Sequence, residues 1–181
     1  MSPTYPFTEE EFRKASEEWG CNCGPSALAF ALQKPLDAVR HEIPEFDAKR
    51  YTSPTMMRDA LSNLNANIDR VPIQEDMRLD GIYRATRPAF LRWMFSDCMA
   101  LVRIQWTGPW TAPGANTKWA YRQTHWIATW ADDQKRQMIF DCNGGISSYE
   151  RWAREVAPAI TVNIDRADGD WFPTHIWRIV S

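Results

Sequence analysis

Hydrophobic and polar residues follow a helical pattern over residues 1–66 of the chain. Thr8 and Glu11 form a capping box that predicts the start of a helix, and Gly20 predicts its end. Between these positions apolar residues recur at the spacing of one helix face. Two more helices are predicted in this part, one over residues 35–43 and one that begins at Ser53.

A further helix is predicted to begin at Cys23 and to end near Gln33. Its apolar run, from Ala27 to Leu32, is uninterrupted, so we expect this helix to be buried on every face. Pro25 suits the first turn, where its missing N–H has no partner to lose. The N-terminus of a helix carries partial positive charge, which draws the thiol of Cys23 toward thiolate, the form that attacks carbonyl carbon.

From residue 67 onward the pattern changes to one typical of strands. The turn-rich segment 107–118 is too long for a simple hairpin, and we expect it to act as a lid or a specificity loop. The expected architecture is α+β: a single domain, residues 1–181, in which the helical half (1–66) packs on an antiparallel sheet in the mainly β half (67–181). Strands are predicted over residues 68–73, 98–106, 124–130, 138–141, 159–164 and 174–180, and helices over residues 87–95 and 149–156.

Two residues of the predicted sheet could assist the Cys23 thiol. His125 stands at the start of one strand, and Asp141 stands at the end of the next. A thiol nucleophile needs a general base, and an imidazole needs an acceptor that fixes its tautomer. Cys23, His125 and Asp141 are therefore the residue types that a catalytic triad combines.

The sequence NCGPSALAFAL, which contains Cys23, resembles the nucleophile motif of the papain-like cysteine peptidase superfamily. The similarity is closest to the double-glycine-type (bacteriocin-processing) branch, and the order Cys23, His125, Asp141 also matches the superfamily. The resemblance implies a papain-like fold, with the cysteine-bearing helix packed on an antiparallel sheet, and hydrolysis through a thioester. The leader-peptide specificity of that branch is not carried over, because the chain has neither membrane spans nor a nucleotide-binding module.

Members of the superfamily usually carry a glutamine shortly before the cysteine, and its amide helps to form the oxyanion hole. This chain has no glutamine before Gln33. The indole N–H of Trp19 or the amide of Asn22 would have to replace it, together with the backbone N–H of Cys23. Loss of one such donor typically costs about a hundredfold or more in rate.

Ten tryptophans are present, and most are expected in the core or between the two halves. Trp106, Trp110 and Trp126, with Trp119, surround the predicted histidine in sequence and are candidates to line a substrate cleft instead.

Each assigned role has a rival in the sequence. Cys23 could be an inert buried thiol, His125 a core histidine and Asp141 a turn former. No metal or cofactor is expected, because a zinc site formed by Cys21, Cys23, Cys142 and His125 would have poor ligand spacing. The competing residues are Cys21 as nucleophile, His41 and His175 as base, and Asn143 as the group that orients the base.

Composition narrows the possible partners and location. The 181-residue chain has a net charge of −2 and a pI near 5.9, which argues against binding to nucleic acid or to an anionic membrane. It shows no secretory signal and no apolar run long enough to span a bilayer. We therefore expect a cytoplasmic protein with free thiols, although export by another route remains open.

These observations support three hypotheses of function. The first is a papain-like thiol hydrolase that cleaves a peptide or isopeptide bond in a polypeptide substrate. The second keeps the triad but acts as an amidase, for example on peptidoglycan stem peptides, or as an acyltransferase. The third is an inactive papain-like module that binds a protein partner in its tryptophan-rich cleft.

Overall fold

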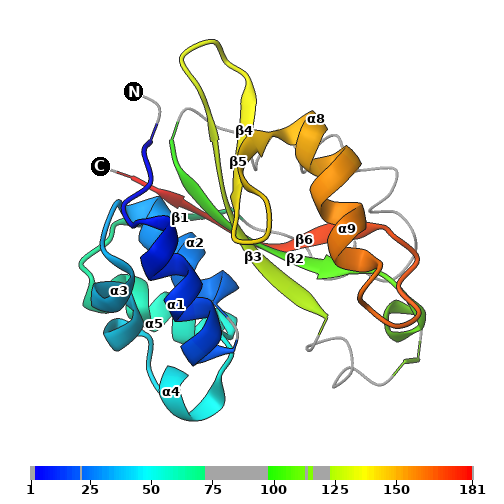
Figure 1. The fold of residues 1–181 in the computed structure, drawn as a ribbon, viewed down its shortest axis with the longest axis horizontal. Coiled ribbons are helices and arrows are strands. Elements are labelled where there is room, and N and C mark those ends of the chain that lie inside the picture. Colours follow the sequence, from blue (N-terminus) through cyan, green and yellow to red (C-terminus); the bar gives the residue numbers. More distant parts are fainter. Residues whose placement is uncertain (1–2, 21, 72–97, 113, 116–122, 181) are drawn as a thin grey trace.

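The computed structural model describes residues 3–20, 22–71, 98–112, 114–115 and 123–180, and shows an α+β architecture (Figure 1). The predicted helix over residues 87–95 lies outside the described residues, as do Cys21, Trp119 and part of the segment 107–118. The first helices are α1 Glu9–Trp19, α2 Cys23–Leu32, α3 Leu36–Glu42, α4 Phe46–Lys49 and α5 Pro54–Asn63. The strands are β1 Ile68–Val71, β2 Ala100–Trp106, β3 Thr124–Ala131, β4 Gln137–Asp141, β5 Gly145–Ser148 and β6 Trp171–Ile179. A helical segment, α8 Tyr149–Arg151, η3 Trp152–Val156 and α9 Ala157–Thr161, follows β5, and a short 3₁₀ helix, η2 Pro109–Thr111, follows β2.

The predicted caps of α1 are confirmed. The side chain of Thr8 accepts a hydrogen bond from the backbone N–H of Glu11, and the Glu11 carboxylate accepts one from the backbone N–H of Thr8 at 2.6 Å. Gly20 ends the helix with a φ of 71°, a value that glycine adopts without the steric cost of a Cβ. The chain can therefore turn directly from α1 toward Cys23.

Helix α2 is the buried centre of the helical part, as its apolar sequence predicts. All of its residues from Gly24 to Ala31 are buried. Its Phe30 ring stacks on Phe140 of β4, with ring centroids 4.3 Å apart and an angle of 4° between the ring planes. This contact fixes α2 against the sheet, so that Cys23, the first residue of the helix, stands at a defined place.

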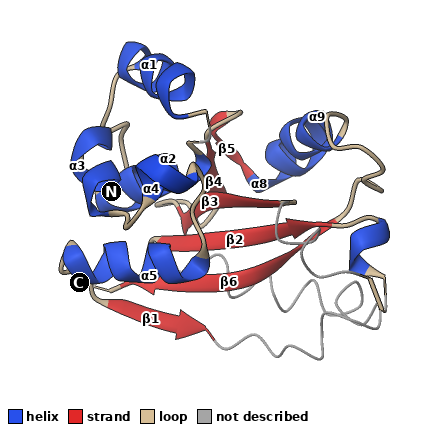
Figure 2. Ribbon diagram, turned by 90° about the horizontal axis from the view of Figure 1, so that it is seen from below, coloured by secondary structure: helices blue, strands red, loops and turns tan. Residues whose placement is uncertain are grey.

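The six strands form one antiparallel sheet in the order β1-β6-β2-β3-β4-β5 (Figure 2). The last strand, β6, inserts between β1 and β2, so the sheet is completed only when residues 171–179 pair with strands more than 60 residues earlier in the chain. Helices α1–α5 lie on one side of the sheet, and α8 and α9 lie on the other (Figure 1). Strand residues alternate between two apolar cores. Leu101, Trp126, Ala128, Trp130 and Phe140 join the core of α1–α5, whereas Val102, Ile104, Trp106, Ile127 and Ile139 join a second core with Trp152 and Ala157.

One predicted strand is wrong. Residues 159–164 were expected to be extended, but residues up to Thr161 belong to α9 and the chain then turns. Ser148 caps this helical segment, because its hydroxyl accepts a hydrogen bond from the backbone N–H of Arg151. Trp152, Ala157 and Thr161 are its buried residues, separated by one π turn and one α turn. Trp152 and Ala157 belong to the second core, and this contact selects the helix over a strand.

Gly24 allows the start of α2 to lie against the loop that precedes α5. A Cβ at this position would come within 2.5 Å of the Cβ of Thr52, whose carbonyl accepts a hydrogen bond from the indole of Trp126 at 2.9 Å. We expect Gly24→Ala to lower the free energy of unfolding in urea by about 1–3 kcal/mol, because the overlap must push α2 and this loop apart. Adding Thr52→Gly should recover part of the loss, and strictly additive losses in the two variants would contradict the contact.

Candidate active site

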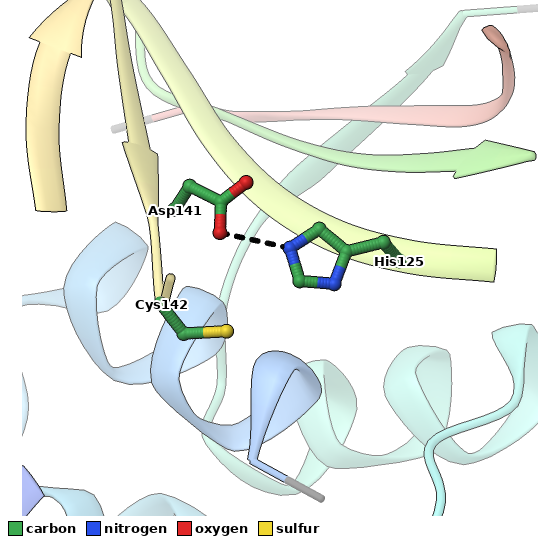
Figure 3. A group of neighbouring side chains, drawn as sticks. All are labelled: His125, Asp141 and Cys142. Carbon is green, nitrogen blue, oxygen red and sulfur yellow. Dashed lines mark hydrogen bonds and ion pairs between the residues drawn. The ribbon is translucent and has the colours of Figure 1, made fainter. Parts of the chain in front are cut away.

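The predicted histidine and aspartate meet at the open end of the β3–β4 pair. The Nε2 atom of His125, near the start of β3, lies 2.9 Å from Oδ1 of Asp141, the last residue of β4 (Figure 3). Both side chains are buried: 8% of the side-chain surface is exposed for His125 and 0% for Asp141. With Nε2 engaged by the carboxylate, Nδ1 is the ring nitrogen left to exchange a proton with another group.

Neighbouring groups hold both members of this pair in place. Oδ1 of Asp141 also accepts the backbone N–H of Asn143 at 2.8 Å, and Oδ2 accepts the indole N–H of Trp152 at 2.8 Å. Trp106 stacks on the His125 ring with centroids 6.2 Å apart. The carboxylate therefore keeps one orientation, and the imidazole is supported from the second core.

The His125–Asp141 contact shifts the pKa of each partner. Burial opposes the charge on His125, but the Asp141 carboxylate and Cys142 more than offset it and raise the pKa of His125 well above 6.5. Burial likewise opposes the charge on Asp141, but His125 and the donors from Asn143 and Trp152 lower the pKa of Asp141 below 3.8. The pair is thus stabilised as imidazolium and carboxylate.

These shifts predict how stability depends on pH. A raised histidine pKa gives a stabilisation that is complete below pH 6.5 and is lost as the pH rises through the folded-state value. The lowered pKa of Asp141 gives a stabilisation of the folded state that is complete above pH 3.8 and is lost as the pH falls through the pKa of Asp141 in the folded protein. We expect the difference in unfolding free energy between wild type and His125→Gln, measured in urea, to be largest between those limits. Replacement of the exposed His41 by Gln is the control, and parallel pH profiles for wild type and His125→Gln would contradict the pairing.

Two thiols belong to this region, and the sequence pointed to only one of them as a site residue. Cys23 is half-buried at the start of α2. Cys142, directly after Asp141, is half-buried and interacts with the His125 ring, and its pKa is raised by burial, although His125 opposes that rise. A negative charge on Cys23 adds to the rise in the pKa of Cys142. In Figure 3 the Cys142 thiol points toward the same region as the side chains of His125 and Asp141.

The rival residues weighed from the sequence lie in different surroundings. His41 is exposed on α3, and His175 lies on β6, where its ring packs on Trp177. Asn143 bonds the Asp141 carboxylate through its backbone N–H, so it supports Asp141 and does not replace it.

The two candidate oxyanion donors differ in their surroundings. Asn22 is half-buried, and its amide donates to the Ser16 hydroxyl at 2.5 Å, which holds it toward α1. Trp19 is 2% exposed and packs against Phe46 and Arg40, and its indole N–H has no acceptor among the described residues. Their role at an oxyanion hole stays a prediction.

The predicted tryptophan cleft requires a correction. Trp106, Trp110 and Trp126 are 2%, 9% and 2% exposed, so they are core residues and not cleft walls. Their indole rings fill space between elements, as the large apolar area of tryptophan favours. Trp106 still contributes to the site, because its ring stacks on the His125 imidazole. Trp152, whose indole binds Asp141, gave no signal in the sequence, whereas the adjacency of Cys142 to Asp141 could have identified that thiol.

A cavity of about 430 Å³ adjoins the site. Its wall includes Asp141, Cys142 and Asn143 on one side and the N-terminal segment with the start of α1 on the other. Aromatic side chains form its apolar surface, namely Tyr5, Phe7, Phe12 and Phe140. A pocket of this size beside titratable groups is a typical place for a small ligand or a substrate side chain.

Within the described part of the chain, three side chains gather that could ligate a metal ion. The potential ligand atoms of His125, Asp141 and Cys142 all lie within 4.8 Å of one another.

None of the described helices has both the length and the hydrophobicity that crossing a membrane would require. Comparison with known proteins finds no family model that matches the chain and no curated protein that is similar to it.

Proposed function

We propose that this chain is a papain-like cysteine hydrolase, which cleaves a peptide or isopeptide bond through a thioester on Cys23. The observation that carries the proposal is the buried His125–Asp141 contact at 2.9 Å, at the end of the sheet where α2 begins. A carboxylate that binds one imidazole nitrogen leaves the other in the tautomer that can accept a thiol proton. The resemblance of the sequence around Cys23 to a nucleophile motif supports the same assignment.

The proposed reaction follows from this arrangement. The raised pKa of His125 keeps the proton of Cys23 on Nδ1, and the thiolate sulfur attacks the carbonyl carbon of the scissile bond. The imidazolium, which Asp141 stabilises, then returns the proton to the leaving amine, and a thioester remains on Cys23. Water, deprotonated by the same ring, hydrolyses the thioester and releases the acid. The first turn of α2 presents backbone N–H groups without acceptors inside the helix, and these could stabilise the oxyanion.

Two arguments favour Cys23 over Cys142 as the nucleophile. Cys23 begins a ten-residue helix, whose partial positive charge stabilises a thiolate. Burial raises the pKa of Cys142, so that this thiol stays protonated at neutral pH. Cys142 nevertheless interacts directly with His125, so an experiment must separate the two thiols.

Alkylation by iodoacetamide at near-neutral pH tests the proposal. We expect Cys23 to react faster than Cys98 and Cys142, with the labelled positions identified by peptide mass spectrometry. The rate at Cys23 should fall in His125→Ala, because the imidazolium no longer stabilises the thiolate. Equal slow labelling of these cysteines, or an unchanged rate at Cys23 in His125→Ala, would argue against a hydrolase.

One observation favours the inactive binding module as a second candidate. The amide of Asn22 donates to the Ser16 hydroxyl, and the Trp19 ring packs against Phe46, so both candidate oxyanion donors have partners in the helical part. The cavity beside Cys142 would then hold a segment of a protein partner. An amidase or acyltransferase would share every feature of the triad, and assays of peptide, ubiquitin-like and peptidoglycan substrates with Cys23→Ala as blank would separate these activities.

A further inference from the structure

The group of His125, Asp141 and Cys142 combines the three ligand types that zinc prefers. Imidazole nitrogen, carboxylate oxygen and thiolate sulfur are the usual ligands of protein-bound Zn²⁺. Here they come from the start of β3, the end of β4 and the residue that follows it. Two of the side chains are buried and the third is half-buried. Metal binding therefore requires little reorganisation of exposed, mobile side chains.

The distances between these atoms are close to those of a zinc site. Zinc–ligand bonds of about 2.0–2.3 Å in a tetrahedron hold their ligand atoms about 3.3–3.6 Å apart. Nε2 of His125 and Oδ1 of Asp141 are 2.9 Å apart. One ring nitrogen of His125, one carboxylate oxygen of Asp141 and the sulfur of Cys142 all lie within 4.8 Å of one another.

The surroundings of the carboxylate and the imidazole also fit a metal site. Zinc ligands are usually held by hydrogen bonds from a second layer of groups. Asp141 receives such bonds from the Asn143 backbone and the Trp152 indole, both of which remain when a metal replaces the proton between Asp141 and His125.

We propose that His125, Asp141 and Cys142 form a reversible zinc site that blocks the triad. Zn²⁺ binds Nε2 of His125, a carboxylate oxygen of Asp141 and the sulfur of Cys142, and it releases the protons carried by Nε2 and by the Cys142 thiol. The ion replaces the hydrogen bond between Asp141 and Nε2 of His125, and the remaining ring proton stays on Nδ1, which then cannot accept the proton of a thiol or of water. The zinc site does not depend on the proposed hydrolase function, whereas the block of turnover by zinc rests on that function.

Cobalt substitution tests the site without any assay of activity. One Co²⁺ per chain should bind to the reduced protein and give the near-ultraviolet charge-transfer band of a thiolate–cobalt bond, which Zn²⁺ then removes by competition. Cys142→Ala should weaken Zn²⁺ binding more than tenfold, while Cys98→Ala, which removes a thiol outside the cluster, should bind normally. Trp152→Phe keeps an aromatic ring but removes the N–H that donates to Asp141, and it should weaken Zn²⁺ binding by about tenfold. Cys142→Ser provides a closer isostere if Cys142→Ala does not fold.

The outcomes separate the two proposals. Absence of the cobalt band in wild type, or an unchanged band and Zn²⁺ affinity in both Cys142 variants, would overturn the zinc site. If Zn²⁺ stops the turnover of p-nitrophenyl acetate in wild type and a chelator restores it, both proposals are supported. If the cobalt band requires Cys142 but wild type shows no turnover at all, the zinc site stands and the hydrolase fails.

Discussion

Cys23→Ala is expected to reduce the turnover of p-nitrophenyl acetate and of fluorogenic peptides by about a thousandfold or more. The alanine side chain cannot form a thioester, and removal of the nucleophile from a triad leaves only the catalysis that binding and oxyanion donors provide. The substitution removes one sulfur at a half-buried position, so the fold should persist. Steady-state rates at matched protein concentration, with circular dichroism to check folding, give the comparison.

The same assay separates the two thiols near His125. Cys142→Ala is expected to keep turnover within about tenfold of wild type, since a thiol with a raised pKa is a poor nucleophile at neutral pH. Cys98→Ala, which alters a thiol outside the cluster, should match wild type. If Cys142→Ala loses turnover and Cys23→Ala keeps it, the nucleophile is Cys142 and not Cys23.

Asp141→Asn is expected to have the second largest effect, on stability as well as on rate. In one orientation of the amide its NH₂ faces the Trp152 indole N–H, and in the other it faces the donors from His125 and Asn143. Either way two donors oppose each other in a buried place, which costs about 3 kcal/mol in the free energy of unfolding. Turnover should fall by about a thousandfold, because the amide can also favour the wrong imidazole tautomer.

A second carboxylate on the same hairpin is the matched control for Asp141→Asn. Asp132, in the β3–β4 turn, accepts hydrogen bonds from the backbone N–H groups of Gln134 and Arg136 and from the Arg136 guanidinium at 2.7 Å. Asp132→Asn should lower stability without changing the turnover measured for the folded protein. Equal losses of rate in the two variants would mean that Asp141 acts only through folding.

Local signals were strong enough to predict much of the helical part and the meeting of His125 on β3 with Asp141 on β4. The capping box of Thr8 and Glu11 and the apolar run of α2 are short-range patterns that hold in the structure. His125 and Asp141 could be paired from sequence because an antiparallel hairpin brings the start of one strand beside the end of the next. The catalytic role of Cys23 remains a proposal.

Features that depend on distant contacts escaped prediction. The insertion of β6 between β1 and β2 pairs Ile68 with Ile179, and no local pattern encodes that choice. Residues 159–164 carry an apolar run short enough to fit either a strand or a helix, and contact with the second core decides. Trp152 reaches Asp141 only because the helical segment after β5 folds back over β4, so its role required the structure.

Mapping of the acyl group is the most direct test of the central claim that His125 activates the Cys23 sulfur. Wild type is mixed with p-nitrophenyl acetate, quenched in acid within the first turnovers and digested, and the acetylated peptide is identified by mass spectrometry. We predict one acetyl group on Cys23 in wild type and almost none in His125→Ala. An acetyl group on Cys142, or equal acetylation of Cys23 in both proteins, would contradict the claim.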